Sequence, residues 1–409
     1  MVLFLTCVQI GNRGTVTEAA GFNPEADVQK LREAMKGAGT NEAAVIEVIA
    51  HRTNAQRQRI KEAYKQSVGK DLADDLSSEL SGNFRSVVLG LLMLAPVYDA
   101  YELRTAMKGA GTEEACLIDI LASRSNAEMR TINAFYKKEY EKSLEDAVCG
   151  DTSGMFQRVL VSLLTAGRDE SDKVDEAQAV LDAKDIYEAG EARWGTDEVK
   201  FLTVLCVRNR NHLMRVFEEY QKISGRDIED SIKREMSGCL EDIFLAIVKC
   251  LRSKPAFFAE RLYKSMKGLG TTDSVLIRIM VARAEIDMLD IKAQFLKMYG
   301  KTLYSFIKEM LDKCRKGLAD VIKKRDKVRI AVKSYKILIP FSLFASVIKS
   351  IEAAEPGYMA RLTSSRSDMA GSASRLYSLR PWARKPPLPN GPKRLTCPGA
   401  LTFQSGRTG

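Results

Sequence analysis

The fold is decided by the stretch Met35-Lys36-Gly37-Ala38-Gly39-Thr40, because the chain contains it more than once. It returns as Met107-Lys108-Gly109-Ala110-Gly111-Thr112 and as Met266-Lys267-Gly268-Leu269-Gly270-Thr271, and a divergent copy runs from Gly190 to Thr196. The second glycines of the four copies, at 39, 111, 195 and 270, are separated by steps of 72, 84 and 75 residues. Copies at such intervals indicate four repeats of one structural unit.

An arginine follows the second glycine of every copy at a distance of 13 residues. These residues are Arg52, Arg124, Arg208 and Arg283. We interpret them as structural, bonding helix-end carbonyls or acids inside each unit.

The residues around the first loop predict short helices. Asn23-Pro24 is typical of a helix start, and the Gly-x-Gly turn ends that helix because glycine readily adopts positive φ. Thr40 is expected to cap the second helix, and Thr53-Asn54-Ala55-Gln56 predicts a capping box at the start of the third. The apolar run at 87–92 predicts a buried fifth helix. No strand-like alternation is present, so we expect an all-α fold with five short helices in each repeat of about 70 residues.

The same pattern divides the chain into segments. They are an N-terminal tail (1–22), repeat 1 (23–94), repeat 2 (95–166), a polar linker (167–177), repeat 3 (178–252), repeat 4 (253–318) and a basic tail (319–409). The C-terminal part of repeat 4 diverges from the pattern, so we expect this repeat to be incomplete. The tail is rich in Ser, Pro, Gly and Arg from about residue 355 and is predicted to be disordered.

Charge is unevenly distributed along the chain. Residues 313–409 contain 20 Lys+Arg and 5 Asp+Glu, so residues 1–312 carry −5 of the total net charge of +10. A mildly acidic repeat region argues against nucleic acid as its partner, since a nucleic-acid binder is expected to present a basic surface.

The cysteines, histidines and apolar stretches of the sequence bear on the cellular compartment of the protein. The eight cysteines and two histidines form no CxxC pair and no zinc-like cluster, and Cys116, Cys206 and Cys250 lie in apolar helical surroundings where reduced buried thiols are expected. The apolar start at 1–5 has no basic region before it, and the apolar stretch at 337–348 is broken by Pro340 and too short to span a bilayer. We therefore expect a cytoplasmic protein with no transmembrane segment.

The loop itself predicts a cation site. A Gly-x-Gly turn between helices exposes backbone carbonyls, which suit Ca²⁺ if a carboxylate completes the shell. Forty residues after the second glycine stand Glu79, Asp151 and Glu235 in repeats 1 to 3, but Met310 in repeat 4, where the neighbouring Glu309 is expected to point elsewhere. The alternative is that the loops are plain interhelical turns and the acids are solvated; repetition of the loop together with the acid favours the metal site.

Together, the loops, the distant acid and the arginine resemble the annexin core over residues 15–308. The resemblance implies four five-helix repeats in a slightly curved disc, with Ca²⁺ loops on the convex face binding anionic phospholipid. Matched position by position, it implies the following ligands: Met35, Gly37, Gly39 and Glu79; Met107, Gly109, Gly111 and Asp151; Gly190, Arg193, Gly195 and Glu235; and Met266, Gly268 and Gly270, the last set without its acid.

Trp194, in the third loop, has two readings. It is either an aromatic packed beside a helix end or, as the resemblance implies, a side chain that contacts the membrane interface, a region that Trp favours.

The sequence thus predicts a non-enzymatic protein that binds anionic membranes peripherally when Ca²⁺ rises, with lateral self-assembly there as a further expectation. No Gly-x-Ser-x-Gly, HExxH or P-loop supports a hydrolase. The alternative function is a helical-repeat scaffold whose basic tail binds acidic lipid or nucleic acid without Ca²⁺. The tail itself is read either as such an arm or as a segment without an evolved role.

Overall fold

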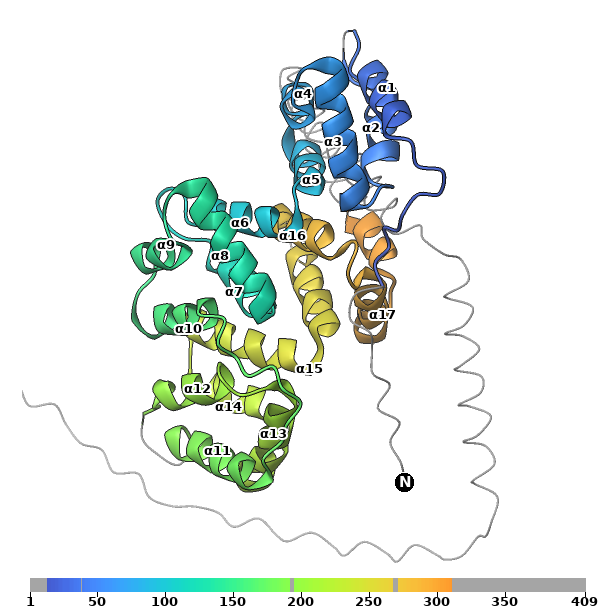
Figure 1. The fold of residues 1–409 in the computed structure, drawn as a ribbon. Coiled ribbons are helices and arrows are strands. Elements are labelled where there is room, and N and C mark those ends of the chain that lie inside the picture. The colour runs from blue at the N-terminus through green and yellow to red at the C-terminus, as the bar shows by residue number, and fades with distance from the viewer. Residues whose placement is uncertain (1–12, 38, 192–194, 268–270, 311–409) are drawn as a thin grey trace, which may run out of the picture. The chain divides into compact units, whose positions relative to one another are not determined.

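The chain is described by a computed structural model over residues 13–37, 39–191, 195–267 and 271–310, and these residues contain helices and no strand. The predicted all-α fold is confirmed. Seventeen helices, α1 to α17, are labelled in Figure 1, and a further helix begins at Leu303 and is described as far as Met310. No helix of this described part is long and apolar enough to cross a membrane.

The helices are grouped below by repeat. Repeat 1 contains α1 (Pro24–Ala34), α2 (Glu42–Ile49), α3 (Asn54–Val68), α4 (Leu72–Glu79) and α5 (Gly82–Leu92). Repeat 2 contains α6 (Ala95–Ala106), α7 (Glu114–Leu121), α8 (Asn126–Tyr140), α9 (Leu144–Asp151) and α10 (Gly154–Leu164). Repeats 3 and 4 contain α11 (Glu176–Ala189), α12 (Glu198–Leu205), α13 (Arg210–Ser224), α14 (Ile228–Glu235), α15 (Gly238–Met266), α16 (Asp273–Arg283) and α17 (Met288–Tyr299).

The helix α15 spans the junction between repeats 3 and 4. It is two helices that meet at Ser253, whose backbone (φ −161°, ψ 102°) is not helical. Pro255 explains the break, because the proline ring disfavours a helical conformation in the residues before it. Repeat 3 therefore passes into repeat 4 through a bend and not through a loop.

The second, third and fourth helices keep their lengths across the first three repeats. The second and fourth helices have 8 residues each and the third helices have 15. The divergent third loop thus belongs to the same structural unit as the other two.

Helix starts confirm most of the predicted caps and correct one. Asn23 accepts a hydrogen bond from the amide of Ala26, and Thr53 and Gln56 form the predicted capping box. Thr40, however, does not cap α2: that place is taken by Asn41, whose side chain accepts from the amide of Ala44. The prediction for Thr40 was wrong because this hydroxyl has another partner, described below.

The first helix packs on the third in each of the first three units, as α1 on α3, α6 on α8 and α11 on α13, and all the helices of a unit contribute to the core. Leu31, Ile60 and Leu72 are fully buried in repeat 1. The predicted buried fifth helix is confirmed, since Val87, Val88, Leu91 and Leu92 of α5 are all buried. Cys116, Cys206 and Cys250 are buried and unpaired, as expected, and burial raises the pKa of Cys206 to about 11 and of Cys250 to about 12.

Helix α16 of repeat 4 connects different repeats. It packs against α5 of repeat 1 and against α6 of repeat 2 (Figure 1). Glu285, just after α16, accepts from the amide of Asn54 at 2.8 Å and lies 3.2 Å from the guanidinium of Arg57, which is itself buried. Repeats 1 and 4 are therefore in direct contact.

The start of the described chain strengthens this contact. The amide of Thr15 donates to the carbonyl of Ala284 at 2.8 Å, and the Arg13 guanidinium pairs with Asp290 at 2.6 Å. Thr15 and Val16 are buried. Residues 13–16, which the sequence assigns to the N-terminal tail, thus pack against the connection between α16 and α17.

The arginine that follows each loop holds the unit together. Arg124 donates through Nε and Nη2 to both oxygens of Asp99 in α6, at 2.7 and 2.8 Å. Arg52 makes the same pair with Asp27, and Arg208 with Asp182. The predicted structural role is confirmed for acids within the unit.

In repeat 4 the arginine that follows the loop is also paired with an acid, but the acid is at a different position. Phe258 stands where the first helices of the other repeats carry the aspartate, and the Arg283 guanidinium lies over its ring at 4.9 Å from the centroid. Arg283 instead pairs with Asp287, one turn further along, at 2.8 and 2.7 Å. The guanidinium is thus compensated even though the aspartate is missing.

We predict that Arg124→Met lowers the free energy of unfolding by about 3–5 kcal/mol, because it leaves the Asp99 carboxylate buried without its partner. Urea denaturation measures the change. Lys184→Gln, which removes an exposed pair with Glu188, is the control and should cost less than about 1 kcal/mol. Equal losses for the two variants would contradict a role for the buried pair.

Candidate metal sites in the interhelical loops

Each loop is closed at its base by one backbone hydrogen bond. In repeat 1 the amide of Asn41 donates to the carbonyl of Ala34 at 2.8 Å. The equivalent bonds join Glu113 to Ala106 (2.9 Å), Asp197 to Ala189 (2.8 Å) and Thr272 to Ser265 (2.9 Å). The bond encloses residues 35–40 in repeat 1, and one residue more in repeat 3. Periodicity alone did not predict this bond.

The glycines of the first two loops have the backbone that the sequence predicts. Gly37 and Gly39 have φ of +103° and +96°, and Gly109 and Gly111 have φ of +109° and +96°. Gly195 follows at +82°. A residue with a Cβ is strained at these angles, so glycine is required by the turn itself.

The third loop differs at its start. Gly190 has φ −122° and ψ −91°, so its φ is not positive as it is at the first glycine of the other two loops. Its Cα faces the acid of the same repeat, because a Cβ placed there would lie 3.4 Å from Cγ of Glu235.

The acid 40 residues downstream meets the loop in all three repeats. The hydroxyl of Thr40 donates to the Glu79 carboxylate at 2.9 Å, and that of Thr196 lies 3.2 Å from both the carboxylate and the backbone oxygen of Glu235. Thr112 donates to the backbone oxygen of Asp151 at 3.1 Å. In repeats 1 to 3 the threonine that ends the loop therefore bonds the acid residue, and the residue after the threonine is the N-cap of the next helix.

Each of these acids is the last residue of its helix: Glu79 in α4, Asp151 in α9 and Glu235 in α14. A carboxylate at this end faces the negative pole of the helix dipole, which is an unfavourable place for an anion. A cation between the carboxylate and the loop would relieve that repulsion. Glu79 and Asp151 are exposed and Glu235 is half-buried, so solvent reaches all three.

The donor set fits Ca²⁺. The loops of repeats 1 to 3 offer backbone oxygens and are each next to the acid residue 40 positions on, and none of the four loops contains Cys or His. Hard oxygen ligands from an irregular loop are those that Ca²⁺ prefers. In repeats 1 and 2, Met35, Gly37 and Gly39, and Met107, Gly109 and Gly111, lie in loops next to their acids.

The fourth repeat departs from this pattern. Thr271 bonds Asp273, two residues on, and not a distant acid. Met310 is buried, with 7% of its surface exposed, and Glu309 pairs with Lys301 at 2.8 Å. Met266 is buried in the end of α15, whereas Gly268 and Gly270 lie outside the described residues.

Two predicted residues of the third loop, Arg193 and Trp194, also lie outside the described residues. The two readings of Trp194 stay predictions.

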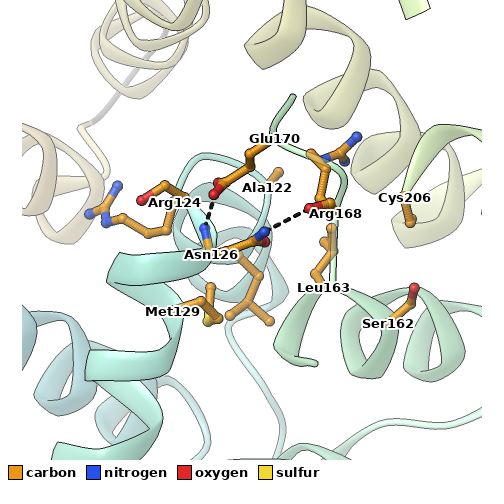
Figure 2. Close-up of a pocket in the computed structure, with 11 residues that line it drawn as sticks. Ala122, Arg124, Asn126, Met129, Ser162, Leu163, Arg168, Glu170 and Cys206 are labelled. Carbon is orange, nitrogen blue, oxygen red and sulfur yellow. Dashed lines mark hydrogen bonds between the residues drawn. The ribbon is translucent and has the colours of Figure 1, made fainter. Parts of the chain in front are cut away.

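A small cavity at the junction of repeats 2 and 3 offers a different kind of site (Figure 2). Its polar groups bond one another, since Asn126 donates from its amide to Glu170 at 2.9 Å and from its side chain to the carbonyl of Arg168 at 2.7 Å. Its volume of about 30 Å³ holds on the order of one water. This cavity joins two repeats and has no room for a larger ligand.

The annexin family profile matches four segments of the chain, residues 26–91, 98–163, 181–247 and 257–318. The chain therefore belongs to the annexin family, a family of calcium- and phospholipid-binding proteins.

Individual relatives agree with this assignment. The chain is 63% identical to annexin A4 of Mus musculus over 295 residues, which cover 72% of this chain and 92% of the relative. It is 56% identical to annexin A11 of Homo sapiens over 72% of this chain and 59% of that one. Among solved structures, annexin III has a TM-score of 0.72 at 48% identity, covering 74% of this chain and 94% of that chain. Chicken annexin V has a TM-score of 0.70 at 51% identity, covering 73% and 94%.

We predict that Gly111→Ala lowers the free energy of unfolding by about 1–2 kcal/mol, because φ is +96° there although open space surrounds the position. Thermal or urea denaturation measures the loss. Gly150→Ala, inside α9, is the matched control and should be neutral or stabilise by about 0.5–1 kcal/mol. A neutral effect of Gly111→Ala would show that the loop does not depend on positive φ.

Proposed function

We propose that this annexin binds anionic phospholipid membranes peripherally, with Ca²⁺ held by the loops of repeats 1, 2 and 3. The observation that carries the proposal is the contact between each loop threonine and an acid residue at the end of a helix, repeated three times. The carboxylates of Glu79, Asp151 and Glu235 would supply charge, and the loop carbonyls would supply the remaining protein oxygens.

Charge explains why the cation is needed. Residues 1–312 carry a net −5, so an anionic membrane repels them. Three Ca²⁺ ions would change this to about +1 and give lipid phosphate or carboxylate a positive charge to bind. The carbonyl of Arg193 and the side chain of Trp194 are proposed to take part in the third loop on the strength of the family resemblance. The loop of repeat 4 lacks its acid and is proposed to contribute little.

The cellular behaviour follows from the same chemistry. The protein is proposed to be cytoplasmic at low Ca²⁺ and to move to membranes when Ca²⁺ rises. Lateral self-assembly would follow only once the protein is concentrated on the surface.

The test is co-sedimentation of the full chain with phosphatidylserine vesicles over a range of Ca²⁺ concentrations. We expect the wild-type chain to sediment with Ca²⁺ and to stay in solution with chelator. The triple variant E79Q/D151N/E235Q should lose Ca²⁺-dependent sedimentation while its helical circular dichroism is unchanged, because only the carboxylate ligands are removed.

A control with the same change of charge is available in the same helices. Asp74, Glu145 and Asp230 are exposed acids in the first turns of α4, α9 and α14. The variant D74N/E145Q/D230N should sediment like the wild-type chain. If both triple variants behave alike, the effect is one of net charge and the proposed ligands are wrong.

The second candidate function rests on the net charge of +15 in residues 313–409, which lie almost wholly outside the repeats. A basic segment of this kind binds acidic lipid without Ca²⁺. Sedimentation of the wild-type chain in chelator, weakened by high salt, would favour this function over the first.

A further inference from the structure

Glu191 of the third loop has a set of contacts that the proposed ligands do not explain. It follows Gly190 directly, and only 9% of its side chain is exposed. Its Oε1 accepts from the hydroxyl of Ser231 at 2.9 Å, and its Oε2 accepts from Arg226 at 2.6 Å and from Arg234 at 3.2 Å. A charged side chain in a surface loop is thus held by three partners.

All three partners belong to one place in the fold. Arg226 lies in the turn between α13 and α14, and Ser231 and Arg234 lie within α14. Arg234 directly precedes Glu235, the acid of the third loop. Glu191 therefore connects the end of α11 to the helix that carries the acid.

The other repeats lack this connection at the same positions. Lys36 and Lys108 take the place of Glu191, and both are exposed. In repeat 1 the negative charge is on the helix instead: Asp75 takes the place of Ser231 and accepts from the hydroxyl of Tyr64 at 2.7 Å. In repeat 3 the carboxylate is in the loop, at Glu191, and not on the helix.

A further observation relates the start of the third loop to Glu235. A Cβ on Gly190 would lie 3.4 Å from Cγ of Glu235, so the loop start and the acid are in contact. Glu191 is the residue next to Gly190, so its bonds to α14 lie directly beside this contact. The pKa of Tyr220 is raised mainly by burial, and the charges of Glu191 and Glu235 both add to this.

We propose that Glu191 is a positioning residue, which fixes the start of the third loop against α14 so that Glu235 and the loop are already adjacent before a cation binds. This inference rests on the proposed function of the third loop. The cation then needs to order less of the protein, which strengthens its binding. In metal sites, residues that orient the ligands affect metal affinity by about 10–100-fold.

The first measurement needs no cation. Hydrogen exchange in chelator reports the backbone bond from Asp197 to Ala189 that closes the loop. In Glu191→Gln we expect faster exchange across residues 189–197, with other loops unchanged, because the amide keeps the shape but loses the two charged bonds. Asp230→Asn is the matched control, since it removes an ion pair with Lys233 on the same helix without touching the loop.

The second measurement isolates the third loop. In the background E79Q/D151N, calorimetric titration with Ca²⁺ compares Glu191→Gln, Glu235→Gln and Asp230→Asn. We expect about tenfold weaker binding for Glu191→Gln, no binding for Glu235→Gln and no change for Asp230→Asn. Unchanged exchange and affinity in Glu191→Gln, with binding lost in Glu235→Gln, would overturn the inference alone. Binding that survives Glu235→Gln would overturn the proposed ligand and the inference together.

Discussion

The structure of each repeat depends on a tight reversal of the chain between its first two helices. Two glycines at positive φ make the turn in repeats 1 and 2, and a single backbone bond, such as that from Asn41 to Ala34, closes it. The closed loop brings Thr40 to the end of α4, where Glu79 stands. Since the turn fixes both the helix packing and the position of the acid, one constraint determines the fold and the site together.

Much of this was readable from the sequence because it is local or repeated. The loops, the caps at Asn23 and Thr53 and the buried α5 depend on neighbouring residues and periodicity. The acid at Glu79 was found only because the same offset recurs. Thr40 was misassigned as a cap, since its actual partner lies 39 residues away and a cap is judged from residues nearby.

Contacts between distant segments were not predictable. The pairing of Arg57 with Glu285 joins residues that share no pattern. The partner of Arg124, Asp99, is different, because it recurs as Asp27 and Asp182 and a search by offset could have found it. Glu191 is a case similar to that of Arg57: its three partners are 35 to 43 residues away, and Asp75 and Ser78 stand in repeat 1 where repeat 3 has Ser231 and Arg234. The role of a residue that differs in one repeat becomes clear only when its spatial neighbours are compared with those of the equivalent residues in the other repeats.

The contact of residues 13–16 with the α16–α17 connection bears on how the array of repeats unfolds. Most repeat proteins are open chains of units, in which the terminal units have one neighbour and fray first. Here the N-terminal tail bonds repeat 4 through Thr15, and repeat 1 bonds it through Asn54 and Arg57, so units at opposite ends of the sequence are neighbours. The order of contacts is circular. A change that destabilises repeat 4 is then expected to destabilise repeat 1 as well as repeat 3. Unfolding is expected to be more cooperative than in an open array of the same length.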